Sequence, residues 1–513
     1  MKQTGRDLWQ WRVKQTPDRP FVRFGELGWT YAEFDDDVRR LAAGLAGIGV
    51  DPGARVLVAM GNAPETIMVH LALQQLGAAF VPLLPGLTSA ELAYPINHSE
   101  ARLLIADQAM GEQVRSMQDQ CPTLERIVST GELAEIAAPD APAPAPLDGY
   151  GEDSLAAILY TSGSTGRPKG VMIRAGSYFS VGDAFADRFG VTGDDTYFLP
   201  TTLSHAVGCL TAVSMTMQRG GTLAIADRFS PSSFWTQLAE TGGTYSILFP
   251  AQLNLLLEAA EGAPAAGEHS LRLVITHAYI GRFRERFGVE LATVWGMTET
   301  GALCVGSESG YLGEHGDNYV GVPMKDVEVA VLDERLNALG PGQNGEIALR
   351  HRHVMLGYLK DPEATKQTLV DGWVRSGDLG VLDDEGRLFF VGRLKNVIKR
   401  SGENISAEEV EATLAEHPDV AESTVFAVAD PVRTEEVFAV VVRRQGTVAD
   451  PISLRGFCGE TLVRWKLPRY IMVRDEPLPR LPSGKLDRVA LRASLDGLEA
   501  WDAQAVASES RAH

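Results

Sequence analysis

Apolar residues in the first part of the chain follow two spacings, one typical of helices and one typical of buried strands. Over residues 31–49 they recur every three or four positions, which predicts an amphipathic helix that ends at Gly49. Continuous apolar runs at 55–60, 79–83 and 103–106 predict buried strands with helices between them. Strands that alternate with helices indicate a mostly parallel α/β sheet.

The pattern changes beyond about residue 320, where short strands separated by turns predict a β-rich subdomain. After Lys395, a helix at 407–416 and a strand at 437–442 predict a small α+β unit. The expected fold class is therefore α/β, with a large N-terminal domain of α/β sheets, a β-rich subdomain and a small α+β C-terminal domain. Residues 499–513 are small and polar, which predicts a flexible tail.

Composition narrows the classes of partner. The formal net charge of −20 disfavours nucleic acid and anionic membranes as partners. The sequence has no run of 18 apolar residues and a polar start, so we expect no membrane span and no secretory signal. Four widely separated cysteines are typical of free thiols in a reducing compartment, so a cytoplasmic location is expected.

One stretch combines glycines, hydroxyls and cations between two apolar runs. It reads Tyr160-Thr161-Ser162-Gly163-Ser164-Thr165-Gly166-Arg167-Pro168-Lys169-Gly170. Glycine lets the backbone approach a phosphate closely, and hydroxyls and a lysine add donors and positive charge. The spacing differs from that of a Walker loop, because proline precedes the lysine and glycine follows it. A flexible linker is the alternative, but linkers do not lie between two buried strands.

This stretch strongly resembles the phosphate loop of the adenylate-forming superfamily, which holds acyl- and aryl-CoA ligases, peptide-synthetase adenylation domains and beetle luciferases. The nearest members look like carnitine/crotonobetaine-CoA ligases and medium-chain acyl-CoA ligases. The resemblance implies a catalytic role for Thr161 and Lys169. It implies nucleotide contacts from Thr161, Ser162, Gly163, Ser164, Thr165, Gly166 and Lys169.

A second segment, Trp295-Gly296-Met297-Thr298-Glu299, follows the apolar run 289–294. A carboxylate just past a strand end in an α/β sheet is well placed for a ligand or metal, although an ordinary turn is the alternative. The segment resembles the superfamily's second core motif. The resemblance implies that Glu299 is catalytic and binds Mg²⁺ on the ATP phosphates, and that Thr298 lies at the α-phosphate. Trp295, Gly296 and Met297 complete the implied nucleotide contacts.

The C-terminal motifs resemble those of the same superfamily, in the same order. Asp378 is implied to bind the ribose hydroxyls, and a carboxylate is a natural acceptor for a diol. Arg393 is implied to bind the ribose or phosphate, and Lys395 to be the hinge between domains. Lys485 is the implied catalytic lysine, which bridges the carboxylate and the α-phosphate. The implied CoA-binding residues are Ser401, Gly402 and Glu403.

Two further segments bear on the acid and the adenine base. His205 is implied to be catalytic and to close one side of an acyl pocket that continues through Ala206, Val207 and Gly208. Relatives carry paired glycines where adenine packs, but this chain has a bulkier loop with His277, Ala278 and Tyr279. These side chains either weaken ATP use or provide a shifted seat, with His277 or Tyr279 stacking beside the base.

The resemblance implies a two-step ligase that uses ATP, Mg²⁺ and CoA to convert a carboxylic acid into a thioester through acyl-AMP. Three alternatives stay open: a ligase that uses a preformed acyl-adenylate, an amino-acid adenylation enzyme and a non-catalytic binding protein. The partners are small molecules, and the resemblance leaves a homodimer open. The implied domains are an N-terminal AMP- and acyl-binding domain, a hinge, a mobile C-terminal domain and a tail, at 1–392, 393–395, 396–498 and 499–513.

Overall fold

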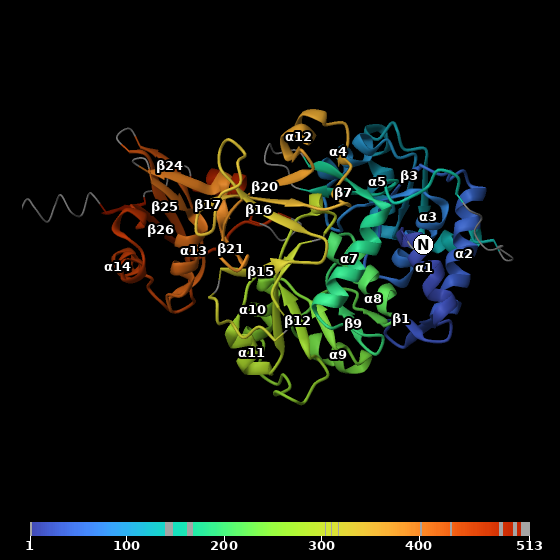
Figure 1. Ribbon diagram of the computed structural model, residues 1–513, viewed down its shortest axis with the longest axis horizontal. Helices are drawn as coiled ribbons and strands as arrows, with labels where there is room; N and C mark the ends of the chain where they lie inside the picture. Colours follow the sequence, from blue (N-terminus) through green and yellow to red (C-terminus); the bar gives the residue numbers. More distant parts are fainter. Residues whose placement is uncertain are drawn as a thin grey trace, which may run out of the picture. The chain divides into compact units, whose positions relative to one another are not determined.

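The computed structural model describes residues 3–138, 147–161, 168–302, 304–308, 310–316, 318–400, 403–430, 433–481, 486–495 and 500–503 (Figure 1). The chain forms two compact units. The first unit comprises residues 1–329, 348–376 and 385–388, and the second comprises 330–347, 377–384 and 389–513. Because the chain passes several times between the units from 329 to 389, this division does not test the predicted boundary at 392 or the hinge at Lys395, and both stay predictions.

One sheet of the first unit contains the early predicted strands. Its strands follow the order β18-β8-β7-β4-β3-β5-β6. The strands from β7 to β6 are parallel, whereas β8 is antiparallel to both β7 and β18. Their bounds are β3 Arg55–Ala59, β4 Ala79–Pro82, β5 Leu103–Ala106, β6 Arg126–Ser129, β7 Leu155–Thr161, β8 Lys169–Arg174 and β18 Gly357–Tyr358. The three apolar runs at 55, 79 and 103 are thus confirmed as strands.

A second run of strands in the first unit follows the order β15-β14-β13-β12-β11-β9-β10-β1-β2. The strands from β13 to β1 are parallel, and antiparallel strands flank them. The bounds are β1 Pro20–Phe24, β2 Leu27–Thr30, β9 Thr196–Leu199, β10 Thr222–Ile225, β11 Tyr245–Ile247, β12 Leu273–Thr276, β13 Glu290–Trp295, β14 Val305–Gly306 and β15 Tyr319–Pro323. The α/β fold class is confirmed.

Helices of the first unit connect these strands, and α7 packs against α8 (Figure 1). The predicted helix at 31–49 is α2, which ends at Gly47. A capping box formed by Thr30 and Glu33 marks the beginning of this helix. The bounds are α1 Gly5–Gln15, α2 Tyr31–Gly47, α3 Pro64–Leu76, α4 Ser89–Ser99, α5 Gln108–Ser116, η1 Gln118–Gln120, η2 Thr130–Glu132, α6 Leu133–Ile136, α7 Ala175–Arg188, η3 Val207–Ala212, α8 Val213–Arg219, α9 Phe234–Thr241, α10 Pro250–Glu258, α11 Gly281–Phe287, η4 Thr298–Thr300 and α12 Pro362–Thr368.

Five further strands follow the predicted β-rich texture beyond residue 320. Strand β19 is antiparallel to the start of β20. Each of the other four passes from one unit into the other along the chain. The bounds are β16 Glu328–Leu332, β17 Asn344–Arg350, β19 Leu369–Val370, β20 Trp373–Leu382 and β21 Leu388–Arg393.

The C-terminal part of the second unit is a small sheet with helices, as predicted. Its strands follow the order β23-β22-β25-β26-β27, and β24 pairs with β25. Apolar side chains of α13, α14 and the sheet, including Ile398, Val410 and Leu454, form its core. The bounds are η5 Leu394–Asn396, β22 Val397–Arg400, β23 Glu403–Ser406, α13 Ala407–Ala415, β24 Val420–Asp430, β25 Thr434–Arg443, α14 Pro451–Thr461, η6 Arg464–Lys466, β26 Tyr470–Arg474, α15 Arg488–Leu495 and β27 Trp501–Asp502.

The structure differs from the predicted tail at two residues. Residues 501 and 502 form β27, which is antiparallel to β26. Arg469 forms an ion pair with Asp502, and Trp501 packs against the core, so both charge and apolar contact hold this segment. A polar composition alone does not reveal such a long-range partner.

Two sequence-level expectations concern the whole chain. The four cysteines are all described, and each is free and buried. Within the described ranges, every helix is too short or too polar to cross a membrane.

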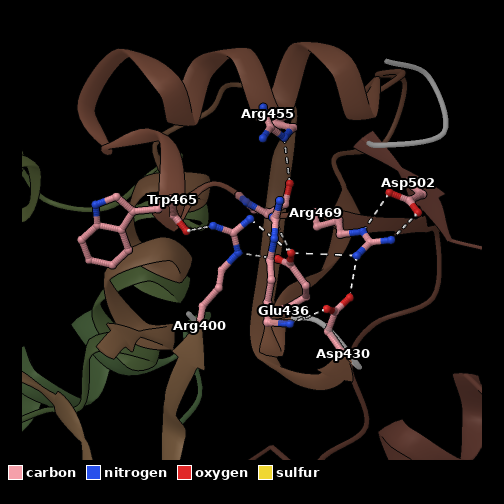
Figure 2. Close-up of polar contacts among 9 residues, drawn as sticks. Arg400, Asp430, Glu436, Arg455, Trp465, Arg469 and Asp502 are labelled. Carbon is pink, nitrogen blue, oxygen red and sulfur yellow. Dashed lines mark hydrogen bonds and ion pairs between the residues drawn. The ribbon is translucent and has the colours of Figure 1, made fainter. Parts of the chain in front are cut away.

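A buried carboxylate organises the polar interior of the second unit. Glu436 on β25 has a side chain with no exposed surface. Its two oxygens accept bonds from Arg400 at 2.6 and 3.1 Å, and Arg433 lies 2.8 Å from one of them. Figure 2 shows the Arg469 guanidinium between the same carboxylate and two others, Asp430 and Asp502. A buried charge is costly without a partner of opposite sign. The arginines therefore stabilise the buried Glu436 carboxylate, and the carboxylate stabilises the arginines.

We predict that Glu436→Gln lowers the free energy of unfolding by about 3 kcal/mol, because it leaves arginines without their buried anion. Urea denaturation followed by tryptophan fluorescence measures the change. The control is Glu460→Gln on the exposed face of α14, which should change the free energy by less than about 0.5 kcal/mol. Equal effects of the two variants would contradict the stabilising role of the network.

Candidate active site

The predicted phosphate loop begins and ends at two paired strand residues. Thr161 is the last residue of β7 and Lys169 the first of β8, and the two are opposite each other in the antiparallel register. The predicted contacts at Ser162, Gly163, Ser164, Thr165 and Gly166 lie outside the described residues. The structure therefore places the two ends of the loop side by side at one edge of the seven-stranded sheet.

Tyr358 connects the phosphate-loop lysine to the predicted metal-binding carboxylate. The Lys169 ammonium lies over the Tyr358 ring, 4.8 Å from its centroid. The Tyr358 hydroxyl donates a hydrogen bond of 2.8 Å to Oε1 of Glu299, which is 7% exposed. Burial raises the pKa of Tyr358, so the phenol keeps its proton and remains a donor. The spacing of the sequence motifs gave no sign of this contact.

The donor set around Glu299 suits a metal ion that arrives with a nucleotide. Among the described residues, no group of three or more His, Cys, Asp or Glu side chains is arranged to hold a metal by itself. Proteins usually bind Mg²⁺ through one or two carboxylates together with substrate phosphates. Glu299 can supply such a carboxylate, and it is the residue that would hold Mg²⁺ together with the phosphates.

The other nucleotide segments emerge together at the carboxyl ends of β12 and β13. These strands are parallel, and Thr276 pairs with Thr293 near their ends. The loop from His277 therefore begins beside the end of β13 at Trp295, and Thr298 and Glu299 follow in η4. In α/β sheets this edge is the usual position of ligands.

The altered adenine loop contributes to a row of aromatic rings. His277 is exposed, and its ring is parallel to that of Phe249 with the centroids 5.5 Å apart. Phe249 also meets His205 edge-to-face at 5.8 Å. Phe249 was not identified from the sequence, because an aromatic residue before a helix is no signal by itself.

The neighbouring Tyr279 packs in a different way. Its ring lies 5.2 Å from that of Tyr311 and against the apolar core of α9, α10 and α11. A side chain at Gly313 would come within 2.5 Å of the Tyr279 ring, so the packing there is close. His277 is thus the better placed of the two predicted side chains to stack on a base, and Ala278 between them is partly buried.

The predicted acyl-pocket segment is held by an amide and followed by an unusual helix. Asn62 donates to the carbonyls of Thr201 and Ala226 and accepts from the Leu203 backbone. The π-helix η3 begins directly afterwards, and such helices are frequent at functional sites. His205 and Val207 are partly buried, and Ala206 is buried. Close packing explains why position 208 is a glycine, because a Cβ there would lie 2.3 Å from the Thr202 carbonyl oxygen.

The remaining predicted residues belong to the second unit. Asp378 on β20 is 9% exposed, and the guanidinium of Arg393, the last residue of β21, lies 3.3 Å from its carboxylate. Lys395 lies in η5 and Glu403 begins β23. The predicted roles of Ser401, Gly402 and Lys485 fall outside the described residues. The structure thus brings together the predicted ribose-binding residues.

Comparison with known proteins gives matches along most of the chain. The AMP-binding enzyme family matches residues 9–359, and the AMP-binding enzyme C-terminal domain matches residues 409–485. The medium-chain fatty-acid–CoA ligase of Escherichia coli K12 is 30% identical over 95% of this chain and 90% of its own. The crotonobetaine/carnitine–CoA ligase of Salmonella enteritidis PT4 is 29% identical over 90% of this chain and 93% of its own.

A solved structure agrees with these matches. The o-succinylbenzoate–CoA synthetase of Bacillus subtilis, in complex with its acyl-adenylate intermediate, superposes with a TM-score of 0.84. It is 26% identical, and the match covers 96% of this chain and 99% of that one. The resemblance found in the sequence motifs is thereby confirmed: the chain belongs to the family of AMP-binding enzymes, in the adenylate-forming superfamily.

Proposed function

We propose that this protein is an AMP-forming acid–CoA ligase. In the first step a carboxylic acid attacks the α-phosphorus of ATP, which gives acyl-AMP and pyrophosphate. In the second step the CoA thiol attacks the acyl carbon, which gives the thioester and AMP. The observation that carries the proposal is that Lys169 and Glu299, far apart in the sequence, meet at the Tyr358 ring within a chain that CoA ligases match over most of its length.

The first step depends on charge stabilisation. Negative charge moves onto the pyrophosphate as the bond from the α-phosphorus breaks, and a fixed cation and hydrogen-bond donors lower the energy of that state. Lys169 supplies the cation, and the hydroxyl of Thr161, which is opposite Lys169 in the strand register, donates to a phosphate oxygen. Glu299 would hold Mg²⁺, which would supply further charge neutralisation. His277, stacked on Phe249, provides a flat surface for the adenine.

The second step depends on residues of the second unit. Asp378 and Arg393 hold the ribose, so that the acyl-adenylate keeps one orientation while the thiol approaches. Ser401, Gly402 and Glu403 are the residues that we propose bind CoA. The carbonyl carbon becomes tetrahedral when sulfur adds. This tetrahedral intermediate then collapses with loss of AMP. A reducing, cytoplasmic compartment is part of the proposal, and the four buried free cysteines support it.

A ligase that uses only preformed acyl-AMP remains the second candidate, because the paired glycines are missing. The exposed ring of His277 against Phe249 supports ATP use, since it replaces a glycine surface with an aromatic one. No contact among the described residues favours an amino-acid substrate. A non-catalytic binding protein is disfavoured, because both charged groups expected for phosphate chemistry are in place.

The proposal is tested with a panel of carboxylic acids incubated with ATP, Mg²⁺ and CoA. Mass spectrometry should detect one acyl-CoA together with equal amounts of AMP and pyrophosphate. Supplying the synthetic acyl-AMP of the accepted acid instead of ATP distinguishes the ATP-using ligase from the second candidate, which uses only preformed acyl-AMP. A protein that forms thioesters from acyl-AMP alone would support that candidate, and one that forms them from neither source would contradict both.

We predict that Lys485→Ala slows ATP–pyrophosphate exchange by roughly a hundredfold or more, the scale of one lost electrostatic contact to the transition state. Thioester formation from supplied acyl-AMP should continue at nearly the rate of the unmodified protein. Loss of both half-reactions to the same extent would contradict the role in adenylation.

We predict that His277→Ala raises the KM for ATP by roughly tenfold, because base–aromatic stacking contributes about 1–3 kcal/mol. The KM for the acid should change little, and His277→Phe should retain most of the affinity for ATP. The matched comparison is Tyr279→Phe, which keeps the ring that packs on Tyr311 and should leave the KM for ATP unchanged. A larger effect at Tyr279 than at His277 would show that the base stacks elsewhere.

A further inference from the structure

Backbone hydrogen bonds fix the place of Tyr358 beside the phosphate loop. Strand β18 pairs with β8, and the amides of Leu356 and Leu359 donate to carbonyls of Met172 and Gly170 at 2.8 Å each. The Tyr358 amide donates to the Thr365 hydroxyl at 2.9 Å. The main chain around the ring is therefore tied directly to the strand that Lys169 begins.

The ring of Tyr358 contacts two opposite charges through different parts of its surface. The Lys169 ammonium lies over the face, where the π electrons attract a cation. The Glu299 carboxylate accepts from the hydroxyl at the edge. If the lysine and the glutamate contacted one another directly, they would form an ion pair that occupies both groups. The phenol gives each charge its own partner while it uses only one of the two carboxylate oxygens.

The backbone of the Glu299 turn is held by the segment that precedes Tyr358. The Met355 amide donates to the Glu299 carbonyl at 2.9 Å. Nε2 of His351 lies 2.7 Å from the Thr300 carbonyl oxygen, and Nδ1 accepts from the His353 amide at 3.0 Å. A carbonyl oxygen only accepts, so Nε2 must carry the proton and the ring is neutral. Burial lowers the pKa of His351 to about 4, which agrees with this tautomer.

The same segment is fastened to the rest of the first unit at His353. Nδ1 lies 2.5 Å from the Ser180 hydroxyl, and Nε2 lies 3.3 Å from a Glu152 carboxylate oxygen. The His353 carbonyl accepts from Ser177, and Gly301, at a φ of +60°, packs so closely that a Cβ would lie 2.7 Å from this oxygen. The segment 351–358 is therefore a fixed support, attached to α7 on one side and to the Glu299 turn on the other.

We propose that Tyr358 and His351 are positioning residues for the adenylation step. Tyr358 orients the Glu299 carboxylate and keeps it apart from Lys169, so that both remain available to the nucleotide phosphates and Mg²⁺. His351 holds the backbone of the same turn through the Thr300 carbonyl. The proposal rests on the proposed function, and neither residue touches the reacting atoms.

The main test is Tyr358→Phe, which removes the hydroxyl but keeps the ring under Lys169. ATP–pyrophosphate exchange should fall by roughly tenfold or more, the scale of one lost hydrogen bond to a charged group. Thioester formation from acyl-AMP should change by less than about threefold, because that step needs no Glu299 carboxylate. Tyr358→Leu, which also removes the ring, should slow exchange further without a larger effect on the second step. His351→Ala should give the same selective loss.

A binding measurement separates positioning from a purely structural role. Calorimetric titration with a non-hydrolysable methylene analogue of ATP is carried out with Mg²⁺ and with EDTA. The gain in affinity that Mg²⁺ gives the unmodified protein should shrink in Tyr358→Phe, whereas affinity in EDTA should stay the same. The thermal unfolding midpoint of each variant is recorded alongside.

Three outcomes would decide against the proposal. Unchanged exchange in Tyr358→Phe would overturn it, and so would an unchanged gain from Mg²⁺. Equal loss of both half-reactions with a lowered unfolding midpoint in Tyr358→Phe and His351→Ala would make both residues structural only. A failure of the unmodified protein to catalyse exchange would instead contradict the proposed function.

Discussion

The hydrogen bond between Tyr358 and Glu299 is the interaction on which the candidate site depends. The protein carries a net charge of −20, so binding a triphosphate requires that positive charge and metal affinity be concentrated at one place. In the proposed function Lys169 and Glu299 provide them, but opposite charges on neighbouring segments would neutralise one another. A buried phenol between them solves this problem at little cost, because it satisfies both groups without using the whole bonding capacity of either.

Buried polar groups support the candidate site of the first unit and the interior of the second unit in different ways. Around the candidate site of the first unit, neutral donors and acceptors such as His351 and Asn62 hold loops in place. In the second unit, full charges are buried around Glu436 and are balanced by arginines. Neutral supports suit a site that must accept an anionic nucleotide, since they add no charge that would compete with it.

Local sequence patterns predicted the elements well, because a strand or helix leaves its periodicity in consecutive residues. The apolar runs at 55, 79 and 103 became β3, β4 and β5 with nearly the expected bounds, and the capping pair of Thr30 and Glu33 marks the start of α2. Of the motif residues, Thr161 ends β7, Lys169 begins β8 and Glu299 follows the end of β13, as their flanking runs indicated.

What the sequence did not reveal are contacts between distant segments. The role of Tyr358 depends on pairing between β18 and β8, and the row of His205, Phe249 and His277 depends on three loops meeting at one sheet edge. The pairing of β27 with β26 likewise turned two residues of a predicted tail into a strand. Neither composition nor periodicity encodes such partners.

The most direct test of the account follows the oxygen atoms of the substrate. An accepted acid labelled with oxygen-18 in its carboxylate is converted to thioester with ATP and CoA, and the nucleotide product is examined by mass spectrometry. Attack of the carboxylate on the α-phosphorus predicts one labelled oxygen in AMP and none in pyrophosphate. Label in inorganic phosphate with ADP as the nucleotide product, or AMP without label, would contradict an acyl-adenylate intermediate.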